Sequence, residues 1–276
     1  MMKTIGFIDY YISEWHANTY PALIKKMSEK LGYDAELKYA YAELDVSPVD
    51  GVTTDEWCEK YGVTRAYSID ELCEKSDFII ILAPSNPEKH LGYAREALPF
   101  GKLTYIDKTF APDYKTALEI FDIAASYGTK IFSSSALRYA EELDLIAPCD
   151  RIEITGGGGN FEEYIIHQVE MLTKKMGIGA LSCSAKDCGD EVIGSVKYKS
   201  GAAATLRWKS GLPFTMSADG KSFTMESPFF DDLLGDILRF FAEGTLSFDS
   251  AETLEVMKIR EALVTSYKTG GKEITL

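Results

Sequence analysis

The sequence of 276 residues is poor in several features, and each deficit excludes a class of protein. Its five cysteines are an odd number without the spacing of a disulfide framework, so we expect free thiols in a reducing compartment. Lys and Arg number 29 against 43 Asp and Glu, and the formal charge of −14 argues against nonspecific nucleic-acid binding. No apolar run approaches the length of a membrane-spanning helix.

Metal ligands and targeting signals are also missing from the sequence. Cys183 and Cys188 lie in a polar segment that we interpret as a loop, and no second cysteine pair or histidine cluster completes a zinc site. We therefore expect no metal. The N-terminus leads directly into an apolar strand without a signal-peptide pattern, and we expect a cytoplasmic protein.

Glycine is missing from the place where a dinucleotide-binding fold needs it. The first predicted strand, Thr4–Ile8, is followed by residues 9–16, which contain no glycine. A dinucleotide fingerprint uses glycines to turn the backbone tightly and bring it close to the pyrophosphate at a helix N-terminus. Here the side chain of Tyr10 would occupy that space, and Asp9 and Glu14 would repel the phosphates.

The first half of the chain nevertheless alternates strands with helices. Such βα repeats predict an α/β fold of the Rossmann type, with a doubly wound parallel sheet in a domain of residues 1–135. The predicted strands are Thr4–Ile8, Glu36–Ala42, Phe78–Leu82, Leu103–Ile106 and Lys130–Ser133.

The second half follows another pattern and predicts an α+β domain of residues 136–276 with a mostly antiparallel open sheet. Turn dipeptides separate alternating runs, as in hairpins. We expect strands at Arg151–Thr155, Glu191–Lys199, Ala202–Lys209 and Phe214–Ala218, helices at Arg138–Leu145, Phe161–Met176, Pro228–Phe241 and Ala251–Lys268, and a flexible run at Gly156–Gly159.

Several landmarks resemble the glucose-fructose oxidoreductase / inositol dehydrogenase (Gfo/Idh/MocA) family over nearly the whole chain. The first is an apolar strand preceded by an aspartate and followed by a proline and a histidine. The others are an Ala-Leu-x-x-Gly-Lys stretch before an acid-Lys pair, a helix with the pattern acid-x-x-x-His-x-x-acid, and a Gly-Lys tail. In this sequence they are Asp77, Phe78–Leu82, Pro84 and His90; Ala97–Lys102 before Asp107-Lys108; Glu163–Glu170; and Ser266–Lys272.

The resemblance implies hydride transfer between a nicotinamide cofactor, NAD or NADP, and a sugar- or polyol-like alcohol. Lys108 would orient the substrate hydroxyl, and His167 would be the general acid and base. Other substrate contacts would come from Glu163, Glu170, Arg138 and Tyr139; cofactor contacts would come from Asp9, Tyr10, Ala83, Pro84, Asn86, His90 and Asp107.

Two departures from the family pattern leave two hypotheses open. The glycine fingerprint is degenerate, and Thr109 stands where the family's Glu-Lys-Pro motif has its proline. The chain is then either an oxidoreductase with a remodelled phosphate loop, or a non-redox relative that binds a sugar-like metabolite or acts as a partner subunit. Under either hypothesis we expect a small-molecule ligand and a homo-oligomer formed through the open sheet of the second domain, including Ala202–Lys209.

Overall fold

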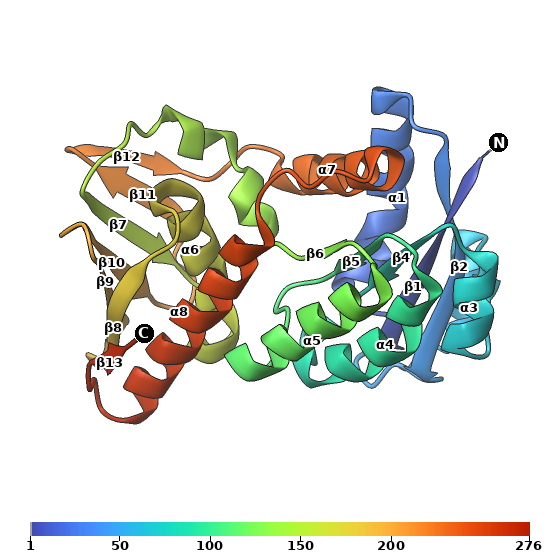
Figure 1. Cartoon of the computed structure of the whole chain (residues 1–276), viewed down its shortest axis with the longest axis horizontal. Coiled ribbons are helices and arrows are strands. Elements are labelled where there is room, and N and C mark those ends of the chain that lie inside the picture. Colours follow the sequence, from blue (N-terminus) through green and yellow to red (C-terminus); the bar gives the residue numbers. More distant parts are fainter. Residues whose placement is uncertain (1) are drawn as a thin grey trace. The chain divides into compact units, whose positions relative to one another are not determined.

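The computed structural model describes residues 2–276, which form two compact units (Figure 1). The first unit contains the chain up to Ser133 together with Asp231–Phe248. The second contains Ser134–Phe230 and Asp249–Leu276. The predicted α/β architecture, with a parallel sheet followed by a mostly antiparallel one, is confirmed.

Six parallel strands form the sheet of the first unit, in the order β3-β2-β1-β4-β5-β6. The order reverses between β1 and β4, and in open α/β sheets ligands bind outside the carboxyl ends of the strands at such a point. The strands are β1 Lys3–Tyr11, β2 Ala35–Leu44, β3 Thr64–Arg65, β4 Phe78–Ile81, β5 Thr104–Ile106 and β6 Ile131–Phe132.

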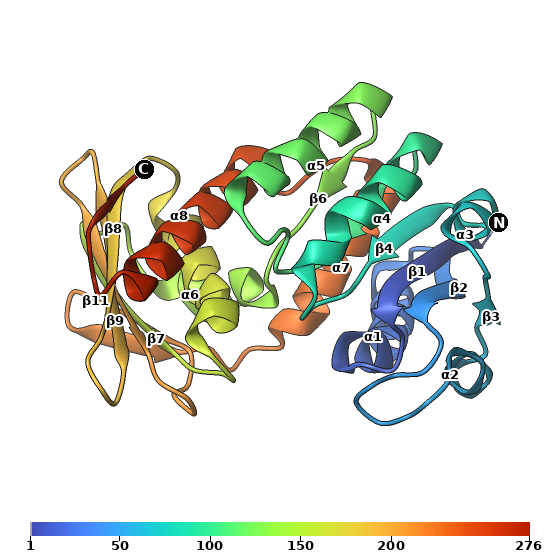
Figure 2. The same cartoon turned by 90° about the horizontal axis from the view of Figure 1, so that it is seen from below.

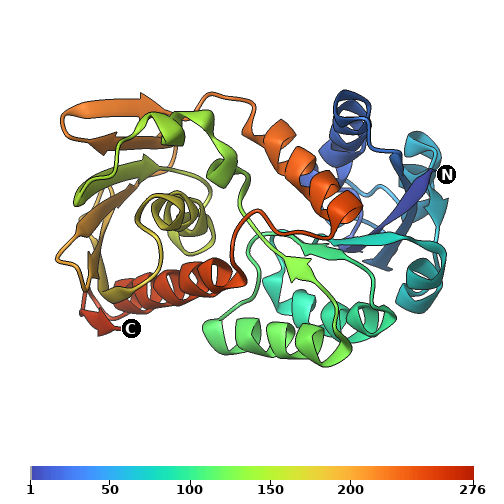
Figure 3. The same cartoon turned by 45° about the horizontal axis from the view of Figure 1, so that its top comes forward.

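Helices cover both faces of this sheet. Figures 1 and 3 show α1 and α7 on one side and α4 and α5 on the other. The central strands between these layers are fully buried at Phe7 and Ile80, and each such side chain contributes roughly 1.5–3 kcal/mol through its burial. The helices are α1 Trp15–Leu31, α2 Thr54–Tyr61, α3 Ile69–Lys75, α4 His90–Ala97, α5 Tyr114–Tyr127 and α7 Phe229–Glu243, with 3-10 turns at Pro87–Lys89 and Leu98–Phe100.

Helix α7 changes the predicted domain division, because residues 231–248 belong to the first unit and not to the second. The reason is its apolar face. Phe241 stacks on Phe78 of β4 with ring centroids 4.7 Å apart. Gly235 fits closely against α1, where a Cβ atom would stand 2.9 Å from the end of Met27.

The second unit is built on a seven-stranded sheet with the order β12-β11-β7-β10-β9-β8-β13, in which only β7 and β10 pair in parallel. Helices α6 and α8 pack on one face of it (Figure 2). The elements are β7 Arg151–Gly156, α6 Phe161–Met176, β8 Ala180–Asp187, β9 Val192–Tyr198, β10 Ala203–Trp208, β11 Thr215–Ala218, β12 Lys221–Thr224, α8 Ser250–Lys268 and β13 Ile274–Thr275.

Two sequence predictions for this unit were wrong. The segment with Cys183 is not a loop but part of β8, and the Cys183 side chain is buried there. Cys188 directly follows this strand and is exposed. The small residues of β8 gave no clear apolar alternation. The predicted helix Arg138–Leu145 is instead two 3-10 turns, Ala136–Tyr139 and Glu141–Leu145.

Candidate functional site

Three strand ends of the first unit meet at the sheet edge where parallel sheets bind ligands. Asp9 lies near the end of β1, Ala83 follows β4 and Asp107 follows β5. The Asp107 amide donates to the carbonyl of Ile81 (2.9 Å), and the Ala83 amide donates to the Asp9 carboxylate (3.0 Å). The structure therefore places three predicted cofactor residues side by side, while their contact with a ligand stays a prediction.

The Asp9 carboxylate is buried and only half satisfied. Its Oδ1 accepts hydrogen bonds from the amides of Tyr10 (2.7 Å) and Ala83, whereas Oδ2 has no hydrogen-bond partner among residues 2–276. Burial raises the pKa of Asp9 well above its usual value, the charge of Glu14 raises it further, and the two amides oppose the shift. Compared with an exposed aspartate, the site favours the neutral acid.

The turn between β1 and α1 is shorter than predicted and is filled by the chain itself. β1 continues through Tyr11, which pairs with the end of β2, so only residues 12–14 connect the strand to the helix. The Glu14 carboxylate caps α1 by accepting backbone hydrogen bonds from His16 (2.7 Å) and Ala17. In dinucleotide-binding folds these first helical amides bind the pyrophosphate.

His16 bridges two carboxylates at the same strand ends. Its Nδ1 lies 3.1 Å from Glu14 Oε2, and its Nε2 lies 3.7 Å from Asp107 Oδ2. Asp107 Oδ1 accepts hydrogen bonds from the hydroxyls of Tyr105 (3.0 Å) and Tyr20 (3.4 Å). Sequence analysis did not assign Glu14 or His16 to the site, although an acid and a histidine directly after a buried strand were a usable signal.

Lys108 is half-buried two residues after β5, and its peptide bond to Thr109 is cis. Near it, the ring nitrogens of His90 face the backbone carbonyls of Phe110 (3.0 Å) and Leu82. His90 is fully buried, and this burial lowers its pKa. The ring therefore ties the loops after β4 and β5 together, and the contact of His90 with a cofactor stays a prediction.

The other predicted cofactor residues surround the loop after β4. Pro84 is buried, and the side-chain amide of Asn86 donates to a neighbouring glutamate (2.9 Å). Lys89 Nζ lies 4.3 Å from the centre of the half-buried Tyr10 ring and also pairs with Glu43 of β2 (2.6 Å). These contacts tie the 3-10 turn after β4 to the ends of β1 and β2.

In the second unit a hydroxyl holds the ring of His167. Ser135 Oγ lies 2.7 Å from His167 Nδ1. The rings of Tyr164 and Phe214 each lie 5.6 Å from the imidazole, centroid to centroid. A hydrogen bond and two aromatic neighbours thus restrict how this side chain can turn.

The glycine run at 156–159, predicted to be flexible, is packed against these aromatic rings. A Cβ atom at Gly156 would stand 2.4 Å from Phe214, and one at Gly158 would stand 2.0 Å from Tyr164. Real Cβ atoms do not approach so closely. The glycines therefore serve close packing around His167.

Arg138 and Glu170, predicted as substrate contacts, form a buried ion pair. Arg138 Nη1 donates to Glu170 (2.8 Å), and Nη2 donates to Glu252. The two residues are 6% and 3% exposed. Burial raises the pKa of Glu170, and the guanidinium charge opposes that shift. The pair is thus internal to the second unit, and contact of either residue with substrate stays a prediction.

Glu163 and Tyr139 occupy less buried positions. The amide of Glu163 donates to the side-chain oxygen of Asn160 (2.9 Å), and its carboxylate accepts from the Asn160 amide group (3.1 Å), so this pair caps α6. Tyr139 is half-buried at the end of a 3-10 turn. Their contact with substrate stays a prediction.

The residues of the β1–α1 turn do not fit the diphosphate of a nicotinamide dinucleotide. Glu14 already occupies the amides that would bind it, and Asp9 occupies the amide after β4. The Glu14 carboxylate would also repel phosphate. The first amides of α1 are therefore hydrogen bonded to a side chain of the same chain.

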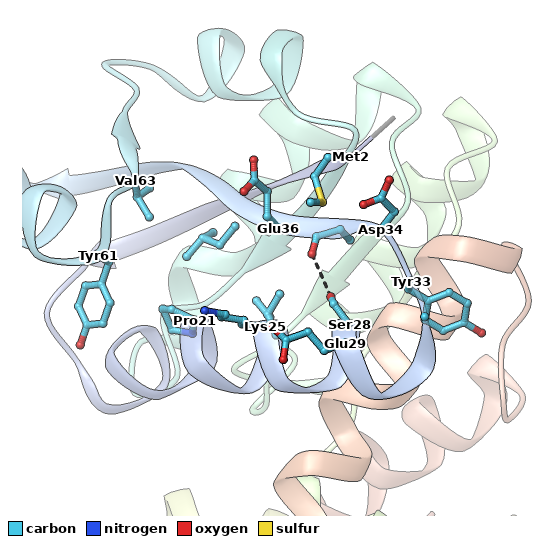
Figure 4. A pocket seen from close by; sticks show the side chains of 14 residues that line it. Met2, Pro21, Lys25, Ser28, Glu29, Tyr33, Asp34, Glu36, Tyr61 and Val63 are labelled. Atoms are coloured by element: carbon cyan, nitrogen blue, oxygen red, sulfur yellow. Dashed lines mark hydrogen bonds between the residues drawn. The ribbon is translucent and has the colours of Figure 1, made fainter.

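A cavity lies elsewhere in the first unit (Figure 4). It measures about 660 Å³ and lies between α1 and the first half of β2, near the amino ends of the strands. Figure 4 shows Lys25 and Glu29 on α1 and Glu36 on β2 among the residues that line it. None of the predicted site residues lines this cavity.

Residues 2–276 contain neither a cluster of metal ligands nor a helix that could span a membrane. Within residues 2–276, no three His, Cys, Asp or Glu side chains are grouped so that they could hold a metal ion. Over the same range, no helix combines the length and apolar character needed to cross a membrane.

The comparisons with known proteins support the fold. No protein-family model matches the sequence, and no curated protein matches it. Among solved structures, a myo-inositol dehydrogenase from Corynebacterium glutamicum aligns with TM-score 0.78 at 13% identity, covering 100% of this chain and 99% of that one. The apo scyllo-inositol dehydrogenase from Lactobacillus casei gives 0.76 at 13%, covering 99% and 98%.

A third structure, GenD2 from gentamicin A biosynthesis in complex with NAD, aligns with TM-score 0.76 at 11% identity and covers 100% of this chain and 96% of that one. The resemblance predicted from the sequence is therefore confirmed as a shared fold over the full length. At these identities the likeness concerns architecture alone.

Proposed function

We propose that this chain binds a sugar- or polyol-like molecule and does not use a nicotinamide dinucleotide in the manner of the dehydrogenases whose fold it shares. The observation that carries this proposal is the Glu14 carboxylate on the first amides of α1. A diphosphate brought to about 4 Å of Glu14 would meet a repulsion of about 4 kcal/mol at an effective dielectric of about 20.

A polyhydroxylated ligand suits the groups at this sheet edge better than an anion does. Carboxylates accept hydrogen bonds from hydroxyl groups, and an ammonium donates to their oxygens. The edge offers the carboxylates of Glu14 and Asp107 and the half-buried ammonium of Lys108. Two of the similar structures are inositol dehydrogenases, which supports the same ligand class.

Lys108 and His167 are the proposed reactive groups. Lys108 would hold the oxygen of a ligand hydroxyl group as charge develops on it, and His167 would exchange a proton with the ligand. Each role is tested by itself, from the ligand affinity of Lys108→Met and of His167→Gln against that of the wild type.

A nicotinamide-dependent oxidoreductase is the second candidate. It is favoured by the full-length match to dehydrogenase structures, including one in complex with NAD, and by a sequence that contains a lysine and a histidine suited to the predicted roles. It requires a dinucleotide to bind in a way that avoids the carboxylates at α1.

Two titrations of the full chain separate the candidates. NADH and NADPH are followed by nicotinamide fluorescence, and myo-inositol, scyllo-inositol and common hexoses are followed by calorimetry. The first proposal expects saturable binding of at least one polyol and no saturable signal with either dinucleotide at millimolar concentration. Saturable micromolar binding of NADH or NADPH would reject it in favour of the oxidoreductase.

Self-association through the second-unit sheet remains part of the proposal. On β10, Thr205 lies on the face away from the helices, where it lines a shallow groove of about 330 Å³. Arg207 on the same strand pairs with Glu191 (2.8 Å). Light scattering should report a homo-oligomer, and Thr205→Arg should shift it toward the monomer.

The five free cysteines suit a cytoplasmic, reducing environment.

A further inference from the structure

Ser135 has a hydrogen-bonding arrangement that constrains the proton on His167. Its Oγ accepts a hydrogen bond from the amide of Leu137 (3.3 Å) and lies 2.7 Å from His167 Nδ1. Ser135 is 1% exposed, so water does not compete at this hydroxyl. A serine hydroxyl has one proton to donate and two lone pairs to accept with.

The position of the hydroxyl proton follows from these contacts. One lone pair of Oγ is used by the Leu137 amide, and the proton needs an acceptor because unsatisfied buried donors are costly. Among the residues that the structure describes, His167 Nδ1 is the acceptor within hydrogen-bond distance of Ser135 Oγ. A neutral imidazole that accepts at Nδ1 carries its own proton at Nε2.

The segment that carries Ser135 is anchored to α6 at two further points. The backbone amide of Ser135 is hydrogen bonded to the Glu170 carboxylate, and Ser134 Oγ lies 3.4 Å from the same group. Arg138 also pairs with Glu170. Glu170 lies three residues after His167 on the same face of α6. These bonds therefore fix where the Ser135 hydroxyl lies along the helix relative to the imidazole.

We infer that Ser135 is a positioning residue that donates its hydroxyl proton to His167 Nδ1 and thereby fixes the ring as the Nε2–H tautomer. His167 then offers a proton donor at Nε2. The group it suits is an oxygen acceptor, such as a carbonyl or hydroxyl oxygen of the ligand. The assignment of a ligand to His167 rests on the proposed function, whereas the tautomer does not.

The test reads the tautomer directly by two-bond ¹H–¹⁵N correlation spectra of the full chain labelled with ¹⁵N-histidine, above the pH at which His167 titrates. The chain has three histidines, and His167→Gln identifies the signal. We expect the Nε2–H pattern in the wild type, its loss in Ser135→Ala, and its return in Ser135→Thr, which keeps a hydroxyl. Ser126→Ala is the control, because the Ser126 hydroxyl donates to the Ile123 carbonyl within α5 (2.7 Å) and takes no part in this arrangement.

Two results would overturn the inference: a wild-type spectrum of the Nδ1–H form, or an unchanged Nε2–H pattern in Ser135→Ala. If Ser135→Ala fails to fold, the wild-type spectrum and Ser135→Thr still decide. The spectra need no ligand, so failure of the tautomer assignment is distinct from failure of polyol binding.

Discussion

Two buried carboxylates, one in each unit, have opposite surroundings. Glu170 has the guanidinium of Arg138 at 2.8 Å, and the two form an ion pair. Asp9 is equally buried, but the charged groups that act on it most strongly are the acids Glu14 and Asp107. The second unit thus compensates its buried negative charge, and the first unit concentrates negative charge where related folds bind an anion.

The largest loss of stability should come from removing the cation beside Glu170, which leaves this buried carboxylate without a positive partner, as Asp9 is. Arg138→Met leaves Glu170 buried without its cation, and breaking a buried pair in this way costs about 3–5 kcal/mol of stability. Denaturant unfolding at neutral pH measures it. The matched control is Arg95→Met, since that side chain is 57% exposed and its pair with Glu119 should be worth at most about 1 kcal/mol. Equal losses would contradict the comparison.

A medium effect is expected at the glycines that pack around His167. Gly158→Ala would place a Cβ atom 2.0 Å from the ring of Tyr164 at a φ of +143°, and overpacking of this kind costs roughly 1–3 kcal/mol. Gly159→Ala is the control, because its nearest contact is 3.5 Å. Unfolding midpoints of the two variants should differ clearly. A Gly158→Ala protein as stable as the control would show that the run is loosely packed.

The smallest effect, and one of opposite sign, should come from removing the uncompensated charge of the first region. The pKa of Asp9 is raised in the folded state, so the folded protein binds more protons than the unfolded chain between the ordinary aspartate pKa and the raised one. Stability therefore falls as pH rises through that window.

Asp9→Asn removes this loss, because the amide keeps an oxygen for the Tyr10 and Ala83 amides and adds a donor near Glu14 and Asp107. We expect the variant to gain stability over wild type at neutral pH and to lose that advantage below about pH 4, near the ordinary aspartate pKa. Urea unfolding across pH 4–8 measures this difference. A variant less stable than wild type at neutral pH would mean that the Asp9 charge is compensated.

The fold was largely predictable because its strongest signals are local and periodic. The bounds of α6 were predicted without error, and β4 reads as an uninterrupted apolar run. The unit to which α7 belongs was not predictable, since an amphipathic helix can pack on either sheet with the same apolar face. β8 was missed because its small residues alternate without a strong apolar contrast.

The candidate site was predictable in position but not in its internal pairing. The sequence placed Asp9, Asp107 and Lys108 at strand ends, where the parallel topology brings them to one edge. It could not show that β1 extends to Tyr11 or that Glu14 turns back to cap α1, because both depend on the exact length of the turn. Partners far apart in the sequence were likewise invisible, as in the pairing of Ser135 with His167.

The occupied N-terminus of α1 is the central claim, and calorimetric titration with inorganic pyrophosphate tests it most directly in wild type and in Glu14→Ser. Serine keeps a neutral cap at a cost of at most about 1 kcal/mol, while it removes the negative charge. Asp113→Ser is the control, because Asp113 caps α5 in the same way through the Thr116 amide (2.7 Å). We predict no saturable binding to wild type or control, and binding to Glu14→Ser at least about tenfold tighter, a difference of about 1.4 kcal/mol. Saturable binding to wild type that Glu14→Ser leaves unchanged would contradict the account.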